Sequence, residues 1–318
     1  MNSNGLRPIN QIHKIAAKTF YNYIFNNDTY FQNYKKLVSG LTDDQKNFID
    51  LTISRALYLY SSQYEILTDF TADELFEQLK VEESLNSKII YDNTNNCYQF
   101  DKYKLPVNFF EAFMFVYKMG FDSIRYPEKV IGKDIIDAGA FCGDSSMVLN
   151  DLFKPSRVFC FEPEESCFNY LLRTIELNNL DKEKFLPINQ GLGNRREVKE
   201  IYTGGAASSI MIAESIDNLL EKTKINITTI DEFVEENNLD IGLIKIDVEG
   251  FDYQVLEGAK KTIRKFKPII MGSIYHNAQQ FFEFKPFIES WNLGYKFHFE
   301  KMNPNKFLNE ISITCEVY

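Results

Sequence analysis

Apolar side chains follow two different spacings along the chain, and the change between them falls near residue 90. In the first part they recur every three or four residues, which is typical of amphipathic helices and predicts helices over residues 14–24, 48–60 and 71–79. The second and third of these follow capping boxes that begin at Thr42 and Thr71. Residues 88–104 instead predict a hairpin, because apolar runs flank the polar turn 92–96. We therefore expect a helical accessory region with a hairpin connector over residues 1–104.

Beyond residue 131, short β-branched runs alternate with longer helical patterns. The runs lie at residues 134–137, 157–161, 185–188, 241–246 and 268–271. The helical patterns lie at residues 144–153, 164–178, 253–265 and 277–291. A further helical pattern, at 107–118, precedes this region. This alternation predicts an α/β fold with a Rossmann-like, doubly wound, mostly parallel sheet. The last two runs, 295–300 and 311–317, are too close in sequence for a crossover, so we expect them to pair antiparallel.

Composition excludes several classes of protein. The 318 residues are 44% hydrophobic and include 28 Phe and 18 Tyr, which a disordered chain would lack. The net charge of −10 argues against a nucleic-acid partner. Neither a membrane-spanning apolar run nor a secretory leader is expected, and the five scattered cysteines have no metal-type spacing. We expect a cytoplasmic protein with reduced thiols.

The first run of the α/β region leads into a glycine loop. Gly139 and Gly143 form a single Gly-x-x-x-Gly turn, which differs from the dinucleotide-binding pattern and lacks the Lys-Ser/Thr of a phosphate-binding loop. Asp137 precedes them and favours a cationic ligand over a pyrophosphate. Glu162 follows the next run, 23 residues after Gly139, where a carboxylate can accept two hydrogen bonds from a ribose diol. Together they predict a cofactor that contains a nucleoside.

These residues belong to a series of short motifs. The series is Asp137–Asp144, Phe161–Pro163, Asn189–Gly193, Ala207–Ser209, Thr228–Phe233 and Lys245–Gly250. In this order the motifs resemble the FkbM family of class I S-adenosylmethionine-dependent methyltransferases, over about residues 105–318. The resemblance implies a methyltransferase domain over 105–318 with S-adenosylmethionine as its cofactor. Such enzymes often have Asn where Phe141 stands, so we expect that ring to wall the pocket differently.

The resemblance also implies which residues hold the cofactor. Those of the glycine loop and the helix start would be Asp137, Gly139, Ala140, Phe141, Gly143, Asp144 and Ser145. Glu162 would bind the ribose hydroxyls, Pro163 would border the adenine, and Asp247 would reach the cofactor from the fourth strand. Asn189 or Gln190 would bond the adenine amine, and the sequence leaves both open.

The fourth and fifth strands supply the candidate catalytic residues. Strand alternation places Lys245, Asp247 and Glu249 on one side. We expect both acids to line the acceptor pocket with Lys245 paired to one of them. The alternative is a neutralising network that only shapes the loop. His276 follows the fifth strand, and its ordinary pKa suits the general base that a hydroxyl acceptor needs. A ring satisfied by the backbone is the alternative.

Several alternatives stay open at this point. Asp247 and Asn277 match part of a Mg²⁺ site known in some O-methyltransferases, but His276 stands where a second Asp would be expected, and we expect no metal. The resemblance suggests a sugar hydroxyl as acceptor, in a nucleotide sugar or a surface-glycan building block. Another small acceptor (a natural product or a phosphate-type group), a dehydrogenase, or a non-catalytic binding protein are the competing functions. Residues 1–90 would form an accessory or homodimer layer, or a substrate lid.

Overall fold

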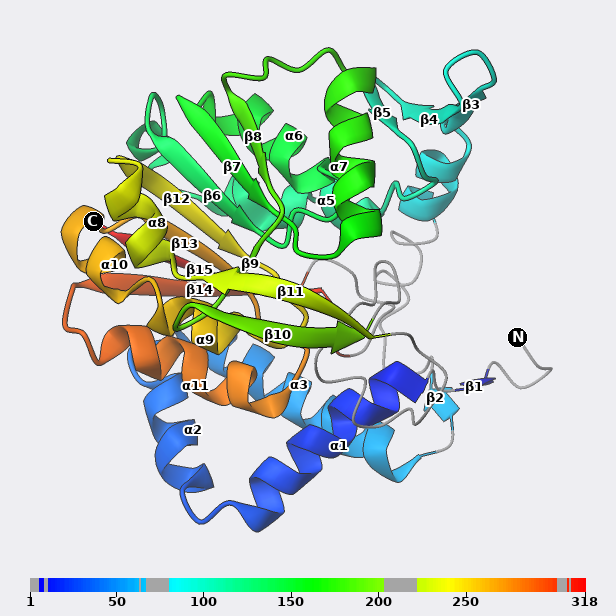
Figure 1. The fold of residues 1–318 in the computed structure, drawn as a ribbon. Coiled ribbons are helices and arrows are strands. Elements are labelled where there is room, and N and C mark those ends of the chain that lie inside the picture. The colour runs from blue at the N-terminus through cyan, green and yellow to red at the C-terminus, as the bar shows by residue number, and fades with distance from the viewer. Residues whose placement is uncertain are drawn as a thin grey trace.

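A seven-stranded sheet forms the centre of the molecule, which we describe from a computed structural model (Figure 1). The structure describes residues 6–8, 11–62, 64–66, 80–202, 222–301, 308 and 310–318. In spatial order the strands are β14 (Tyr295–Lys301), β15 (Ile311–Val317), β13 (Ile269–Ser273), β12 (Ile241–Ile246), β6 (Asp134–Ala138), β7 (Arg157–Phe161) and β8 (Phe185–Ile188). The five strands from β13 to β8 pair in parallel. β15 is antiparallel to both of its neighbours, so β14 points in the same direction as the five. The predicted mostly parallel sheet with an antiparallel C-terminal pair is confirmed.

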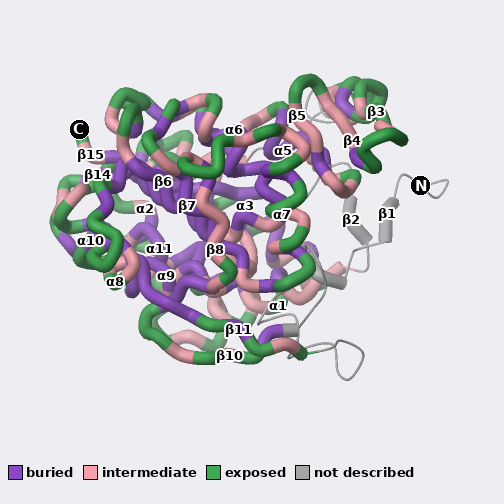
Figure 2. Tube along the Cα trace, turned by 45° about the horizontal axis from the view of Figure 1, so that its top comes forward, coloured by how far each residue is buried: buried purple, intermediate pink, exposed green. Residues whose placement is uncertain are grey.

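Helices cover both faces of this sheet, so its central strands are buried throughout (Figure 2). Alternate residues enter different cores: Ile136 and Ile244 lie in one, Ile135 and Leu243 in the other. The second core contains residues of α5 (Ala112–Phe115), α6 (Asp144–Phe153) and α7 (Glu165–Leu177). The first contains residues of α8 (Ile230–Glu236), α9 (Asp252–Glu257), α10 (Lys260–Phe266) and α11 (Ala278–Glu289). The fold is therefore doubly wound, as predicted.

Two predicted helices differ from the structure. The pattern at 253–265 predicted one helix, but it is split into α9 and α10 at Gly258, where a Cβ atom would lie 1.9 Å from the carbonyl oxygen of Gly193. The pattern at 107–118 contains only the short α5, and a 3₁₀ turn over Lys118–Ser123 follows it. Met119 and Gly120 take positive φ in that turn, which prevents a longer helix. The predicted helix at 71–79 and the motif at 207–209 lie outside the described residues.

The N-terminal helices pack on one edge of the molecule. They are α1 (Gln11–Asn26), α2 (Tyr30–Val38), which the sequence pattern did not predict, and α3 (Asp43–Ser61). Phe20 is fully buried against Phe281 and Phe282 of α11. The side chain of Gln45 exchanges two hydrogen bonds with the backbone of Phe299 on β14. These helices thus share a core with the sheet, while the domain boundary near residue 104 and a homodimer through this layer stay predictions.

Smaller sheets complete the fold. The predicted hairpin is confirmed as β3 (Ile90–Asp92) and β4 (Cys97–Phe100), and β5 (Tyr103–Leu105) adds a third strand. A second sheet, which the sequence did not predict, contains β9 (Gly191–Leu192), β10 (Glu197–Tyr202) and β11 (Lys222–Thr228). Strands β1 (Leu6–Pro8) and β2 (Tyr64–Ile66) form a two-stranded pair. Among the helices that the structure describes, none has the length and apolar character to cross a bilayer.

Candidate cofactor and acceptor site

A cavity of about 350 Å³ opens at the carboxyl ends of β6, β7 and β12, where ligands bind in sheets of this type. Ten of the predicted site residues line it: Gly139, Phe141, Asp144, Ser145, Glu162, Pro163, Gln190, Lys245, Asp247 and Glu249. Five others are not among its lining residues: Asp137, Ala140, Gly143, Asn189 and His276. The parallel sheet therefore brings the two predicted groups, cofactor and catalytic, to one cavity.

The glycine loop is shaped by close packing. Gly139 has a φ of +82°, and a Cβ atom there would lie 1.9 Å from the carbonyl oxygen of Asp247. Gly143 has a φ of +86° and precedes α6, and its Cβ would meet Leu171 of α7 at 2.8 Å. Both positions thus need glycine for conformation and for space. Gly139 holds the loop against the end of β12, a packing role beyond the ligand approach expected from the sequence.

Phe141 takes a φ of 44° between these glycines. This left-handed region favours Asn and is unusual for a bulky residue. The backbone N–H of Phe141 donates to Glu162 Oε2 at 3.0 Å. Its ring packs edge-on to Phe109 with centroids 4.8 Å apart. Phe141 therefore forms an aromatic wall of the cavity.

A buried ion pair lies beneath the loop. Asp137 has no exposed surface and accepts hydrogen bonds from the hydroxyls of Ser145 and Ser146 at 2.7 and 2.6 Å. Its other oxygen lies 3.0 Å from Lys245 Nζ, which also donates to the carbonyl of Gly139 at 2.7 Å. The prediction that Lys245 pairs with Asp247 or Glu249 is wrong, because β12 lies beside β6 with Lys245 directly opposite Asp137. Lys245 thereby fastens the glycine loop to β12.

Glu162 connects the glycine loop to the end of β7. Its two carboxylate oxygens accept hydrogen bonds from the backbone N–H groups of Phe141 and Glu164, at 3.0 and 2.9 Å. Burial raises the pKa of Glu162 to about 7, and the two backbone hydrogen bonds oppose that rise. Glu162 lines the cavity, and a carboxylate oxygen that accepts one hydrogen bond can accept another, for example from a diol.

The two amides that follow β8 have different surroundings. Asn189 donates from Nδ2 to the carbonyl oxygens of Glu162 and Pro163, at 3.0 and 3.2 Å. Gln190 lines the cavity. Of the two amides that the sequence left open, Gln190 is therefore the one placed to face a ligand, and Asn189 supports the backbone of the loop after β7.

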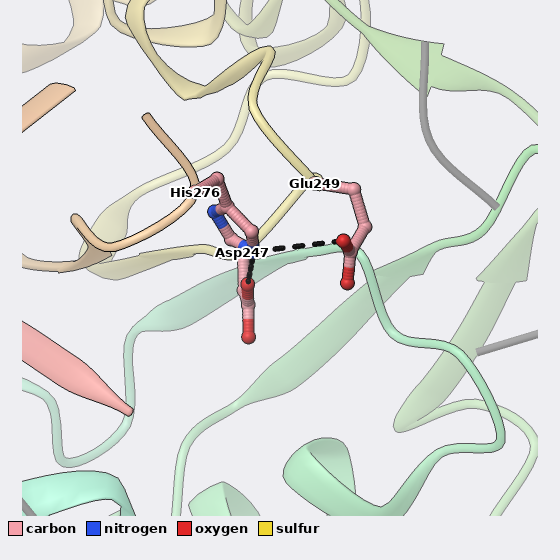
Figure 3. Close-up of side chains that lie close together, drawn as sticks. All are labelled: Asp247, Glu249 and His276. Carbon is pink, nitrogen blue, oxygen red and sulfur yellow. Dashed lines mark ion pairs between the residues drawn. The ribbon is translucent and has the colours of Figure 1, made fainter. Parts of the chain in front are cut away.

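Asp247 and Glu249, which line the cavity, come together with His276, and we call the three residues the acid–histidine cluster (Figure 3). His276 Nε2 lies 3.5 Å from Asp247 Oδ1 and 3.6 Å from Glu249 Oε2. The three donor atoms lie within 4.8 Å of one another, a spacing that also suits a small cation. Asn277, the other residue of the alternative metal set, instead caps α11 by accepting from Gln280 N.

The turn after β12 places the two acids side by side. The strand ends at Ile246, and Glu249 and Gly250 take φ values of 53° and 103°. The expected alternation therefore applies to Lys245 but not to the acids, which the turn directs toward His276. The ring of His276 lies behind them: only 9% of its side chain is exposed, and neither nitrogen reaches the surface. Its predicted role as base stays a prediction, with the carboxylates between it and the cavity.

The charges of this cluster influence one another. Burial raises the pKa of Glu249 to about 7, although His276 opposes the rise. Burial lowers the pKa of His276, but the carboxylates of Glu249, Asp252 and Asp247 outweigh that effect and raise it above its ordinary value. The cluster thus contains a carboxyl group, Glu249, whose pKa lies near neutral pH beside a histidine, a combination typical of acid–base sites.

Sequence reasoning missed two parts of the site. One is the apolar wall from the second sheet and the turn after β12: Leu192, Ile201, Ile225, Ile227 and Phe251. Alternating apolar residues in β11 are a signal that could have indicated it. The other is Asp252, a fully buried carboxylate that faces His276. An acid in the first turn of a helix is ordinarily exposed, and no sequence signal distinguished this one.

Comparison with known proteins decides the family. The model of the methyltransferase FkbM domain matches residues 137–299, which is half of the chain and spans the glycine loop, Glu162 and the acid–histidine cluster. The chain belongs to the FkbM methyltransferase family. It is therefore an S-adenosylmethionine-dependent methyltransferase, as the motifs indicated.

Individual relatives of this FkbM methyltransferase are distant. It is 25% identical over 173 residues to Methyltransferase 1 of Beauveria bassiana, a match that covers 49% of this chain and 68% of that protein. A crystal structure of methyltransferase FkbM from Methylobacillus flagellatus is similar with a TM-score of 0.47 and 14% identity, over 86% of this chain and 71% of that one. M. jannaschii TYW2 in complex with AdoMet has a TM-score of 0.35 and 12% identity, over 72% and 86%. Likenesses this distant carry no argument about the acceptor.

Proposed function

We propose that this enzyme transfers a methyl group from S-adenosylmethionine to a hydroxyl of a small polar acceptor, a sugar. The observation that carries the proposal is the opening of the acid–histidine cluster onto the same cavity as Glu162. A ribose-binding carboxylate and a proton-accepting cluster on one cavity are the two functions that methylation of a hydroxyl requires.

The residues around the cavity fit the proposed cofactor. Glu162 would accept hydrogen bonds from the ribose hydroxyls, and Gln190 with Pro163 would border the adenine. The carboxylate of Asp144 and the cavity-facing Asp247 suit the cationic groups of the methionine part. The cofactor supplies a methyl group that is already electrophilic, so the protein has only to align the acceptor and remove its proton.

The lining of the cavity supports a sugar. Rings of Phe109, Phe141 and Tyr275 offer flat apolar surfaces to it, and the carboxylates that line it can accept hydrogen bonds from hydroxyls. Of the described residues that line the cavity, Lys245 alone is a lysine or arginine, and Asp137 neutralises it. The methylated hydroxyl would therefore lie on an uncharged ring, and a phosphate group of a nucleotide sugar would lie away from this lining.

The acid–histidine cluster would take the proton of the acceptor. As the acceptor oxygen bonds to the methyl carbon, its O–H bond breaks and the bond from carbon to sulfur breaks with its electrons staying on sulfur. The proton passes to Glu249 or Asp247, which face the cavity, and from there to His276 behind them. One positive charge leaves the sulfur and one arrives on the cluster, so no other reactant is needed.

A direct test incubates the protein with methyl-labelled S-adenosylmethionine and a panel of acceptors, followed by mass spectrometry. The panel contains free, glycan-linked and nucleotide-linked sugars together with small hydroxylated natural products and phosphate-bearing compounds. We expect label on one hydroxyl of one sugar class. Label on a natural product or a phosphate-type group instead, or cofactor binding without transfer to any member, would contradict the sugar proposal.

Two neighbouring glutamates give a matched test of the cofactor site. Glu162→Gln removes a charge that would face the ribose, and a hydrogen bond to a charged group contributes about 1.5–3 kcal/mol, so binding of S-adenosylhomocysteine is expected to weaken by about 10- to 100-fold. Glu164→Gln is the control, because Glu164 is equally buried but caps α7 outside the cavity. Calorimetry should show weakened binding for the first variant alone, and equal losses for both would contradict the assignment.

The wider setting of the enzyme follows from the same features. We propose that it acts in the cytoplasm, in the synthesis of a polysaccharide or surface glycan, and that the N-terminal helices form an accessory layer or a homodimer contact. Five buried free cysteines agree with a reducing compartment. A measurement of molecular mass in solution for the full chain and for a variant with altered exposed aromatics, Phe25 and Phe31, would test the dimer.

A further inference from the structure

Asp252 is buried without exposure at the start of α9, outside the lining of the cavity. Its carboxylate nevertheless accepts hydrogen bonds from groups that shape the site. The backbone N–H groups of Val248 and Gly250 donate to it at 3.4 and 3.1 Å, and Gln280 of α11 donates from Nε2. Asp252 thus holds the turn that carries both acids of the acid–histidine cluster.

The same carboxylate faces the far side of the histidine ring. Asp252 Oδ2 lies 3.9 Å from His276 Nδ1, while Asp247 and Glu249 lie near Nε2. His276 therefore stands between acids on both of its nitrogens. Asp247 and Glu249 face the cavity, and Asp252 is shielded from it.

Other groups around His276 come from α11, from β12 and from the segments between elements. Gln280 of α11 is neutral, and Tyr275 lies next to the ring with centroids 4.2 Å apart. The charge of Lys245 on β12 interacts with those of Asp247 and Glu249, and the charges of Glu111 and Glu310 interact with Tyr275. Among these described groups Asp252 is the carboxylate on the Nδ1 side.

We propose that Asp252 is a positioning residue for methyl transfer, one that fixes the turn 247–251 and supports His276 when the ring receives the proton of the acceptor. The catalytic role of Asp252 rests on the proposed function, whereas its effect on the charge of His276 does not. A fixed carboxylate 3.9 Å behind the ring stabilises its positively charged form by charge attraction. Asp252 touches neither the cavity nor the reacting atoms.

The test measures the pKa of His276 by NMR, which needs no knowledge of the acceptor. The chain has only three histidines, so a His276→Gln protein assigns the signal. Asp252→Asn removes a charge about 4 Å from the ring and is expected to lower the pKa of His276 by about one unit. Asp231→Asn is the matched control, since Asp231 also accepts two backbone hydrogen bonds, from Lys261 and Thr262, but does so at α10.

Further variants separate charge from folding. Asp252→Ser is smaller, still accepts a hydrogen bond and replaces the Asn protein if that one does not fold, and Asp252→Glu retains the charge and should keep the pKa of His276 near its wild-type value. Where transfer is measurable, kcat should fall by about tenfold or more in the neutral variants while the KM for S-adenosylmethionine stays unchanged. An unchanged pKa of His276 in the neutral variants overturns the inference. A wild-type protein that transfers no methyl group would overturn the proposed function instead and leave the pKa test valid.

Discussion

The buried pair of Lys245 and Asp137 makes a prediction whose size follows from the structure. Lys245→Met keeps the apolar stem but leaves the carboxylate of Asp137 uncompensated, and both side chains are at most 3% exposed. Removing one partner of such a pair costs about 3–5 kcal/mol. A chain of 318 residues has an unfolding entropy of about 0.7 kcal/mol per kelvin at about 2.1 cal/mol/K per residue, so the melting temperature should fall by about 4–7 °C.

A double-mutant cycle identifies the partner of Lys245. Adding Asp137→Asn to Lys245→Met removes both charges, so the double variant should be destabilised by much less than the sum of the two single variants, with a coupling of about 2–3 kcal/mol. The control cycle replaces Asp137→Asn by Asp247→Asn, and its coupling should be smaller, because the charge of Asp137 raises the pKa of Lys245 more than that of Asp247 does. The assay is calorimetric melting at neutral pH. Additive losses in the first cycle, or a larger coupling in the second, would refute the pairing of Lys245 with Asp137.

Three further predictions concern the chemistry. Glu249→Gln should lower kcat by about 100-fold with little change in the binding of S-adenosylhomocysteine, because the lost group acts on the acceptor's proton. Initial rates and calorimetry measure the two effects, and weakened cofactor binding with normal kcat would argue against this role. The pKa of His276 is raised, and a base works only when deprotonated, so kcat/KM should fall as pH drops through a midpoint above the ordinary value for histidine; a pH–rate profile with its midpoint at or below that value disagrees. Removal of divalent cations with EDTA should leave the transfer rate unchanged, since the cluster itself takes the proton, and a loss that Mg²⁺ restores would assign the cluster to a metal instead.

The α/β part of the fold could be predicted from the sequence because its signals are local. Runs such as 157–161 and 241–246 are apolar apart from one charged residue in each, Arg157 and Lys245, as is typical of parallel strands buried on both faces. Residues that follow such strands gather at one edge of the sheet, so the order of the motifs along the chain is enough to assign Glu162 and Asp247 to one pocket. Thr42 illustrates the same point for the helices, because its side chain accepts from Gln45 N as the capping box predicts.

The parts that could not be predicted depend on which segments lie side by side. The partner of Lys245 is set by the register of β12 against β6, more than a hundred residues earlier in the chain. Its own neighbours in sequence, Asp247 and Glu249, were the wrong partners because the strand ends before them. Asp252 has the sequence pattern of an exposed helix-start acid, and only α11 and the turn packed over it make it buried. The two-residue strand β9 is likewise too short to leave a periodic signal.

Binding of the cofactor is the most direct test of the central claim. Titration of the purified protein with S-adenosylmethionine and S-adenosylhomocysteine in a calorimeter should give saturable binding of one molecule per chain, competed away by either ligand and weakened by Glu162→Gln. An NAD-dependent enzyme built on the same sheet would bind the nicotinamide cofactor instead. Failure of both sulfur-containing ligands to bind the wild-type protein would contradict the account.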